Sequence, residues 1–496
     1  MKRNLLLFLL LLSLGAYSQN VQKIVFEPGD SVNGYYLAIP PLSGTVRGVL
    51  AVFCPFQKAE SILPETRLHN IAAATDLLTV YCSTGMRLLP DSSAIQLMDR
   101  VLAHVAGKFG ADTSRFAVGG FDLAGTSVLR YAELAQEHPQ DLSIHPHAVF
   151  GIAAPVDLTG LYHRYERQIK KNYFPPTMGE ARFITDRFNK EQGTVAEHPE
   201  HYTSLSPFST AASEPGNERW LRHTALRLYY DTDIEWQLKT RRNGFYDTDL
   251  PDASELIDRL LLQGNTRAEF VTSRLPGVRS NGMRHTSSYS IVDETDCIRW
   301  ITRSLHIFSP SNPMSYAGPY EFTAPDKWAV ERSAFPPPFA PDVKLTGVEE
   351  IRFMPGWGVA GAYDYWSLAY LFWLDAGQPV DASVLKEMIR TYYDGLIVNG
   401  GGGGPRNIPK DKLFPTRVNI GHVKTEPDDT DTWTGTVDML DYKAMVPMKL
   451  YFAAHLKACD DKKHFPLFLE LSPRPFEDPI WKEVKQPKQN FKYLPE

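Results

Sequence analysis

The chain has 496 residues, of which 43% are hydrophobic and 22% are charged, as in soluble globular proteins with two or three domains. A formal net charge of -6 provides no basic surface for a phosphate backbone, so nucleic acid is not an expected partner. The four cysteines, Cys54, Cys82, Cys297 and Cys459, are too few and too scattered for a disulfide framework or a zinc site. We expect buried, unpaired thiols and no cofactor.

The N-terminus has the three parts of a secretory signal peptide. A basic start at Lys2 and Arg3 is followed by an apolar run from Leu5 to Leu14 and by small residues up to Ser18. The apolar run is too short to span a bilayer comfortably. We therefore predict a signal peptide over 1–18 and an exported protein, periplasmic or extracellular, without stable membrane insertion after cleavage.

Residues 19–154 alternate between apolar strands and amphipathic helices. The strands are expected at 25–26, 34–40, 48–54, 77–82, 116–118 and 147–154, and the helices at 64–74 and 93–109. The first two strands are expected to be antiparallel, and the continuously apolar third is typical of a central parallel strand. This alternation predicts a mostly parallel sheet with helices on both faces.

The segment 156–223 interrupts the alternation, because it is polar, aromatic and loop-rich. Its two close histidines, His198 and His201, lack further ligands at fixed spacing, so a turn is favoured and no metal site is predicted. The alternation then resumes with a strand at 225–230 that ends at Asp231 and Asp233. A helix at 253–263 and a strand at 268–272 lead to His285 and a final helix at 292–303.

A second domain is predicted beyond a proline-rich linker at 308–345. Residues 346–496 form a separate α+β domain, which resembles the tail of some uncharacterised exported bacterial proteins and has no predicted role. Helices are expected at 366–375 and 382–393, and a closing helix near Trp481. Antiparallel strands are expected at 416–424, 433–439, 448–457 and 465–471.

The stretch from Arg115 to Arg130 carries the most specific pattern. An apolar strand meets a helix through Gly120-Phe121-Asp122-Leu123-Ala124, which resembles the nucleophile elbow Gly-x-Ser-x-Gly of the α/β-hydrolase superfamily. The order of the elbow, an acid after a later strand and a histidine after the next also matches that superfamily. The resemblance covers about residues 30–305. It implies an α/β-hydrolase domain over 19–307, with 156–223 as its lid.

The resemblance also implies the site residues. Asp122 occupies the nucleophile position, His285 is the histidine, and the amides of Phe56 and Leu123 form the oxyanion hole. Asp233 is preferred to Asp231 as the acid, because the run that follows it resembles the acid loop of related esterases.

An aspartate at the elbow changes the chemistry. With an unperturbed pKa near 3.9 it is anionic without a base, but its attack on an ester carbonyl gives only a reactive anhydride. Attack on a saturated carbon gives an ester that water activated by His285 can hydrolyse, which is the scheme of epoxide hydrolases and haloalkane dehalogenases. The chain departs from both families at Leu123, where they usually carry tryptophan, and at Cys54-Pro55-Phe56, where a His-Gly pair is usual.

Two functions follow from this site. The first is an exported hydrolase of a small-molecule or peptide substrate that uses Asp122 and His285. The alternative is a pseudoenzyme, a catalytically inactive α/β-hydrolase-fold protein that binds a ligand or partner. Whether Asp122 and His285 meet in one water-accessible pocket distinguishes them.

Overall fold

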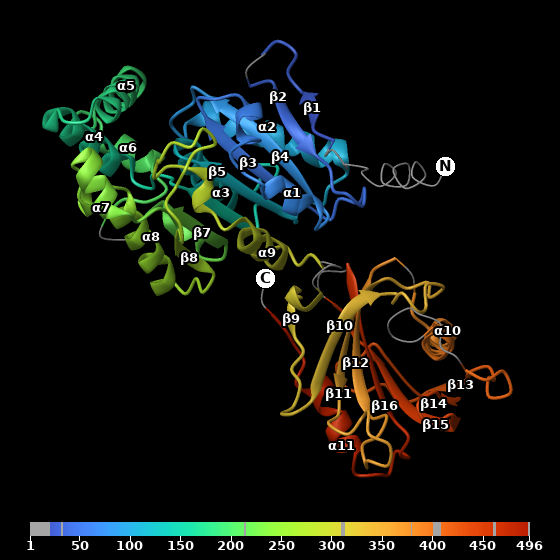
Figure 1. Cartoon of the computed structure of the whole chain (residues 1–496). Helices are drawn as coiled ribbons and strands as arrows, with labels where there is room; N and C mark the ends of the chain where they lie inside the picture. Colours follow the sequence, from blue (N-terminus) through green and yellow to red (C-terminus); the bar gives the residue numbers. More distant parts are fainter. Residues whose placement is uncertain are drawn as a thin grey trace, which may run out of the picture. The chain divides into compact units, whose positions relative to one another are not determined.

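The computed structural model describes residues 20–30, 33–212, 215–308, 313–377, 379–399, 408–459 and 463–494. The predicted signal peptide lies outside these residues. The chain divides into two compact units, Met1–Ile307 and Phe308–Glu496 (Figure 1). No helix in the described ranges has both the length and the apolar character needed to cross a membrane.

The first unit is built on an eight-stranded sheet with the order β1-β2-β4-β3-β5-β6-β7-β8. β2 is antiparallel to both of its neighbours, and every pair from β4 to β8 is parallel. The strands are β1 Gln22–Val25, β2 Tyr35–Ile39, β3 Gly48–Pro55, β4 Leu77–Gly85, β5 Phe116–Phe121, β6 Ala148–Ile152, β7 Ala225–Tyr230 and β8 Ala268–Thr272.

Helices cover both faces of this sheet. Residues of α2 Ser92–Phe109, α3 Leu123–Glu137 and α8 Leu250–Leu262 share one apolar cluster with one face. Residues of α1 Leu68–Ala73 and α9 Glu294–Ser304 share another cluster with the opposite face. This doubly covered, mostly parallel sheet is the α/β-hydrolase fold that the sequence predicts.

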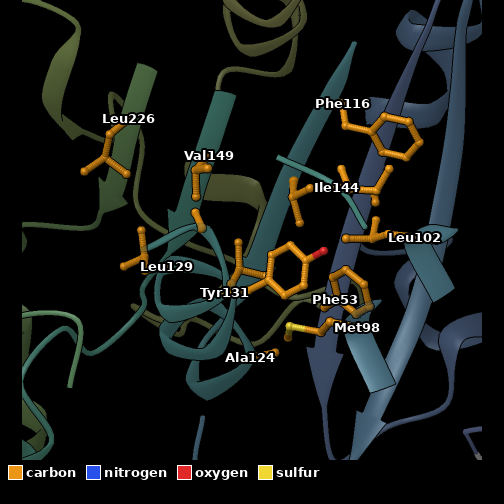
Figure 2. Packing of buried hydrophobic residues seen from close by; sticks show 14 of the residues in the cluster. Phe53, Met98, Leu102, Phe116, Ala124, Leu129, Tyr131, Ile144, Val149 and Leu226 are labelled. Carbon is orange, nitrogen blue, oxygen red and sulfur yellow. The ribbon is translucent and has the colours of Figure 1, made fainter. Parts of the chain in front are cut away.

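The helix α3 is held in place by close packing. Figure 2 shows Tyr131 of α3 beside Met98 of α2 and Phe53 of β3, and all three side chains are fully buried. The Tyr131 hydroxyl also donates a hydrogen bond of 2.8 Å to Asp99. Burying one such side chain stabilises a fold by about 1.5–3 kcal/mol. This packing fixes the N-terminus of α3, which carries the elbow aspartate.

The predicted loop-rich segment is mostly helical, which corrects the sequence interpretation. It forms α4 Leu158–Lys171, α5 Pro175–Gln192 and α6 Pro199–Leu205. Asp157 caps α4 by accepting a hydrogen bond of 3.1 Å from Gly160 N–H. Proline begins both α5 and α6, since the first turn of a helix needs no N–H donor there. Pro175 and Pro199 therefore mark helix starts.

The second unit is built on a seven-stranded antiparallel sheet with the order β10-β11-β12-β16-β15-β14-β13. Its strands are β10 Ala329–Phe335, β11 Gly347–Phe353, β12 Leu368–Asp375, β13 Arg417–His422, β14 Asp431–Asp441, β15 Val446–Leu456 and β16 His464–Ser472. The short strands β9 Tyr320–Glu321 and β17 Lys492–Tyr493 pair separately. The helices are α10 Ala382–Asn399, α11 Trp481–Val484 and α12 Gln486–Gln489. The predicted strands after residue 412 and the closing helix are confirmed.

The helix predicted at 366–375 is wrong, because Leu368–Asp375 form the interior strand β12. Tyr370 and Phe372 belong to one apolar cluster, and Leu371 and Trp373 to another. Alternate residues thus point to opposite faces, and both faces are covered. A short apolar run without visible alternation fits a buried helix and a doubly covered strand equally well.

The proline-rich segment predicted as a linker contributes to the second unit. Its residues Ala329–Phe335 form the edge strand β10, which pairs along its whole length with β11. The prolines at 336–338 follow this strand and therefore remove no hydrogen bond from the ladder.

Candidate active site

The turn between β5 and α3 holds Asp122 on strained backbone. Asp122 has φ 53° and ψ -135°, a conformation that costs a residue other than glycine about 1–3 kcal/mol. A Cβ atom on Gly120 would lie 2.5 Å from Gly125 Cα, and one on Gly125 would lie 2.5 Å from Ala154 Cβ. The close approach of helix to strand therefore requires glycine at 120 and at 125. Ala124, a departure from the superfamily pattern, is accommodated.

The carboxylate of Asp122 is held through one oxygen only. Oδ1 accepts a hydrogen bond of 2.8 Å from Leu123 N–H. Among the described residues no side chain or amide donates to Oδ2. One oxygen is thus fixed by the first amide of α3, while the other remains available to a ligand.

Burial raises the pKa of Asp122 to about 7, and the nearby carboxylates of Glu180 and Asp249 add to this effect. The Leu123 amide acts in the opposite direction, because it stabilises the anion. Near neutral pH the site therefore contains comparable amounts of carboxylic acid and carboxylate, and small changes in its surroundings change the fraction of the nucleophilic form.

The raised pKa predicts a pH-dependent stability difference between the protein and its Asp122→Asn variant. Between pH about 4 and 7 the unfolded chain ionises at Asp122 while the folded chain keeps its proton. The wild type therefore loses up to about 1.4 kcal/mol per pH unit across this window, and the variant does not. Calorimetric unfolding of both proteins from pH 4 to 8 measures the difference. Parallel curves would contradict the buried environment of this carboxyl group.

His285 lies in the loop before α9 and is oriented by the main chain. Its Nδ1 atom is 2.9 Å from the Ser287 carbonyl oxygen and 3.0 Å from the Ser287 nitrogen. Burial and the guanidinium groups of Arg241 and Arg279 lower the pKa of His285 to about 3. The imidazole is therefore neutral at physiological pH.

Neither predicted acid contacts His285. Arg284 binds both acids instead, Asp231 at 2.8 Å and Asp233 at 3.1 Å. Asp231 also accepts from Gly277 N–H at 2.7 Å, and Asp233 caps the short helix α7 Ile234–Trp236 through Trp236 N–H. No contact supports Asp233 as the acid that orients His285, and this role stays a prediction. The Ser287 main chain is the partner that the sequence analysis missed.

The two predicted oxyanion amides are both engaged within the protein. Leu123 N–H binds the Asp122 carboxylate, as described above, and Phe56 N–H donates to the Gly85 carbonyl at 2.8 Å. The Phe56 side chain is exposed and its ring faces that of Phe183 in α5 at 6.2 Å. Of the two amides, only that of Leu123 therefore contacts a group with a role in the predicted chemistry, the carboxylate of Asp122.

Asp122 and His285 line the same pocket, which has a volume of about 130 Å³. Asp231 lines it as well, whereas Asp233 does not. Its remaining walls come largely from α4, α5 and the segment before α8. These walls carry both signs of charge and a phenol: Arg164, Tyr165, Gln168, Glu180, Gln237, Arg241, Asn243, Asp247 and Asp249. A cavity of this size and polarity fits a small, polar ligand.

Several lining residues have buried polar atoms without a partner in the protein. These atoms are Gln168 Nε2, Gln237 Oε1, Arg241 Nε, Asn243 Oδ1 and Ser287 Oγ. A buried polar atom that forms no hydrogen bond costs about 1–3 kcal/mol, so such atoms are normally satisfied by water or a ligand. Their concentration around one cavity indicates a binding site.

The sequence analysis missed most of the wall residues on α4. Leu161, Arg164, Tyr165 and Gln168 all line the pocket, and their spacing is that of one helix face. This signal was present in the sequence but was hidden by the interpretation of the segment as loop.

No family model and no curated protein matches the chain. Among solved structures, the esterase EstE5, in a crystal soaked with p-nitrophenyl butyrate, is 12% identical with a TM-score of 0.36 over 58% of this chain and 85% of that one. A Pyrobaculum calidifontis esterase is 16% identical with a TM-score of 0.36, over 57% and 84%. The acylaminoacyl peptidase of Pyrococcus horikoshii is 14% identical with a TM-score of 0.35, over 61% and 42%.

Proposed function

We propose that the first unit is a hydrolase that opens a small polar epoxide through a covalent ester on Asp122. The observation that carries this proposal is the unequal binding of the two carboxylate oxygens. Oδ1 accepts from Leu123 N–H at 2.8 Å, while no described protein donor binds Oδ2, in a pocket that His285 also lines. The predicted signal peptide makes this an exported activity, periplasmic or extracellular.

In the first step Oδ2 of the ionised Asp122 attacks an epoxide carbon. The C–O bond of the ring breaks, its electron pair goes to the ring oxygen, and that oxygen takes the phenolic proton of Tyr165, which leaves a phenolate. Tyr165 of α4 lines the pocket, and burial together with nearby carboxylates keeps its pKa well above the usual range, so its hydroxyl stays protonated. Such a phenol is therefore protonated before the reaction and can transfer its proton to the more basic alkoxide oxygen as the ring opens.

In the second step water attacks the carbonyl carbon of the ester. Oδ1 is then the carbonyl oxygen, and the Leu123 N–H already bound to it stabilises the negative charge that develops there. When Nδ1–H of His285 donates a hydrogen bond to the Ser287 carbonyl, Nε2 is the base that takes a proton from water. The ester bond breaks at the carbonyl carbon, and the leaving diol oxygen takes the proton held on Nε2. The remaining carboxyl proton of Asp122 returns to the Tyr165 phenolate, which regenerates both groups.

Isotope labelling tests the covalent step directly. After one turnover of a small epoxide in H₂¹⁸O, the peptide that contains Asp122 should carry one heavy oxygen, because water attacks the carboxyl carbon of the ester. A reaction in which water attacks the epoxide itself labels only the diol. Label in the diol and none in Asp122 would therefore refute the ester intermediate.

The alternative function, a non-catalytic binding protein, has its own supporting observation. Phe56 N–H is bound to Gly85, and both predicted acids are bound to Arg284 rather than to His285. If this alternative holds, small polar compounds bind the pocket with no turnover of esters or epoxides, and no label enters Asp122. Calorimetric titration of the compounds used in the turnover assay separates the two functions.

A further inference from the structure

The second unit contains a partly buried polar cluster that the proposed hydrolase does not use. Glu426 and Asp429 come from the segment between β13 and β14, and His455 comes from β15. One atom of each lies within 4.8 Å of the corresponding atoms of the other two. Lys488 of α12 contacts all three through Nζ, at 2.7 Å to Glu426, 3.2 Å to Asp429 and 2.9 Å to His455 Nδ1.

When Lys488 is the cation at the centre of the cluster, neither protonation state of His455 Nδ1 suits both of its neighbours. Nδ1 lies 2.8 Å from Asp429 Oδ2 and 2.9 Å from Lys488 Nζ. If Nδ1 carries a proton, it binds the carboxylate but opposes the ammonium donor. If Nδ1 lacks the proton, it accepts from the ammonium group but sets its lone pair against the carboxylate oxygen. A metal ion accepts lone pairs from both atoms and removes the conflict.

The distances between the candidate ligand atoms suit a small divalent cation. His455 Nδ1 lies 2.8 Å from Asp429 Oδ2 and 3.6 Å from Glu426 Oε2. Ligands at about 2.0–2.2 Å from a tetrahedral zinc ion are roughly 3.4 Å apart. Small side-chain movements would bring all three atoms to this geometry.

Two buried carboxylates provide independent support. The side chain of Asp429 is fully buried, and its Oδ1 atom has no hydrogen-bond partner, although Lys457 Nζ lies 3.9 Å away. Glu470 is also buried, accepts no hydrogen bond, and lies 3.5 Å from His455 Nε2, on the opposite side of the ring from the cluster. A histidine that binds a metal through one nitrogen usually donates its other N–H to a carboxylate, and Glu470 is placed for this role.

We propose that Glu426, Asp429 and His455 form a divalent-cation site of the Zn²⁺ class, and that Lys488 occupies it as an internal cation when metal is absent. Lys488 leaves the site in this proposal, and its release is limited to α12, which has only four residues, Gln486–Gln489. The ammonium group and the metal then compete for the same three atoms.

Calorimetric titration of the full chain with Zn²⁺ tests the proposal. Lys488→Met should bind Zn²⁺ at least about tenfold more tightly than wild type, because the metal no longer has to displace the ammonium group. Each charged hydrogen bond broken in that displacement lowers the affinity by about this factor. Lys485→Met is the matched control, because Lys485 lies 3.8 Å from Glu426 but contacts neither of the other two ligands. Its affinity should stay within about twofold of wild type.

Ligand variants made in the Lys488→Met background complete the test. Asp429→Asn and His455→Gln should each lower the affinity at least about tenfold, whereas His422→Ala, which removes an exposed His422–Asp431 pair, should not. Circular dichroism verifies that each variant is folded. Absence of Zn²⁺ binding by folded Lys488→Met, or equal binding by its Asp429→Asn form, would overturn the proposal and leave Lys488 as a purely structural cation.

Discussion

Replacement of Asp122 by alanine should abolish epoxide hydrolysis, with a loss of at least about 10⁴-fold in kcat, because the covalent intermediate has no other carboxylate to form on. The variant loses the hydrogen bond from Leu123 N–H, but the apolar packing of α3 does not involve this side chain, so the variant should fold. Steady-state turnover of a small epoxide, with unfolding curves of both proteins, provides the measurement. Activity that survives in Asp122→Ala would place the reaction elsewhere.

Two further variants show which half of the reaction each residue serves. His285→Gln should still form the ester but hydrolyse it slowly, so that one equivalent of substrate adds to the protein mass.

Asp122→Ser should lose epoxide hydrolysis and gain turnover of an activated ester, because Leu123 N–H becomes free to bind the ester oxyanion. One such donor contributes about 10²–10³ to the rate. A serine variant as inactive as the alanine variant would show that one amide is insufficient here.

Replacement of Arg164 by methionine should destabilise the first unit by about 3–5 kcal/mol. Arg164 is buried on α4 and binds Asp249 and Asp252 at 2.5 Å each, which joins α4 to the start of α8. Methionine preserves much of the volume but leaves two carboxylates without their cation beside the pocket. Urea unfolding, combined with limited proteolysis of α4 and α5, measures the loss.

Arg167→Met is the matched control on the same helix. Arg167 pairs with Asp247 at 3.2 Å, but its side chain is 47% exposed, and exposed pairs contribute about 1 kcal/mol or less. Equal losses in the two variants would mean that Arg164 contributes no more than a surface charge. A large loss only in Arg164→Met would show that the buried pair fixes the pocket wall.

The sequence of the first unit determined its fold and the position of Asp122. Strands such as 48–54 are apolar throughout because both faces of a central parallel strand are covered. The glycines around the elbow are required where β5 and α3 approach most closely, and this local requirement is visible without a structure. The same local reasoning failed for 366–375, because burial on both faces leaves no alternation to identify a strand.

The partners of the site residues were decided only by the tertiary structure. Asp233 and Arg284 are 51 residues apart in the sequence, and this spacing does not specify which carboxylate pairs with which cation. Arg284 binds both acids, and His285 is left to the main chain of Ser287. Likewise, the cluster of Glu426, Asp429, His455 and Lys488 joins segments up to 62 residues apart. Such groupings depend on strand register and helix docking. Many weak contacts over the whole chain determine both, so no local sequence pattern reveals them.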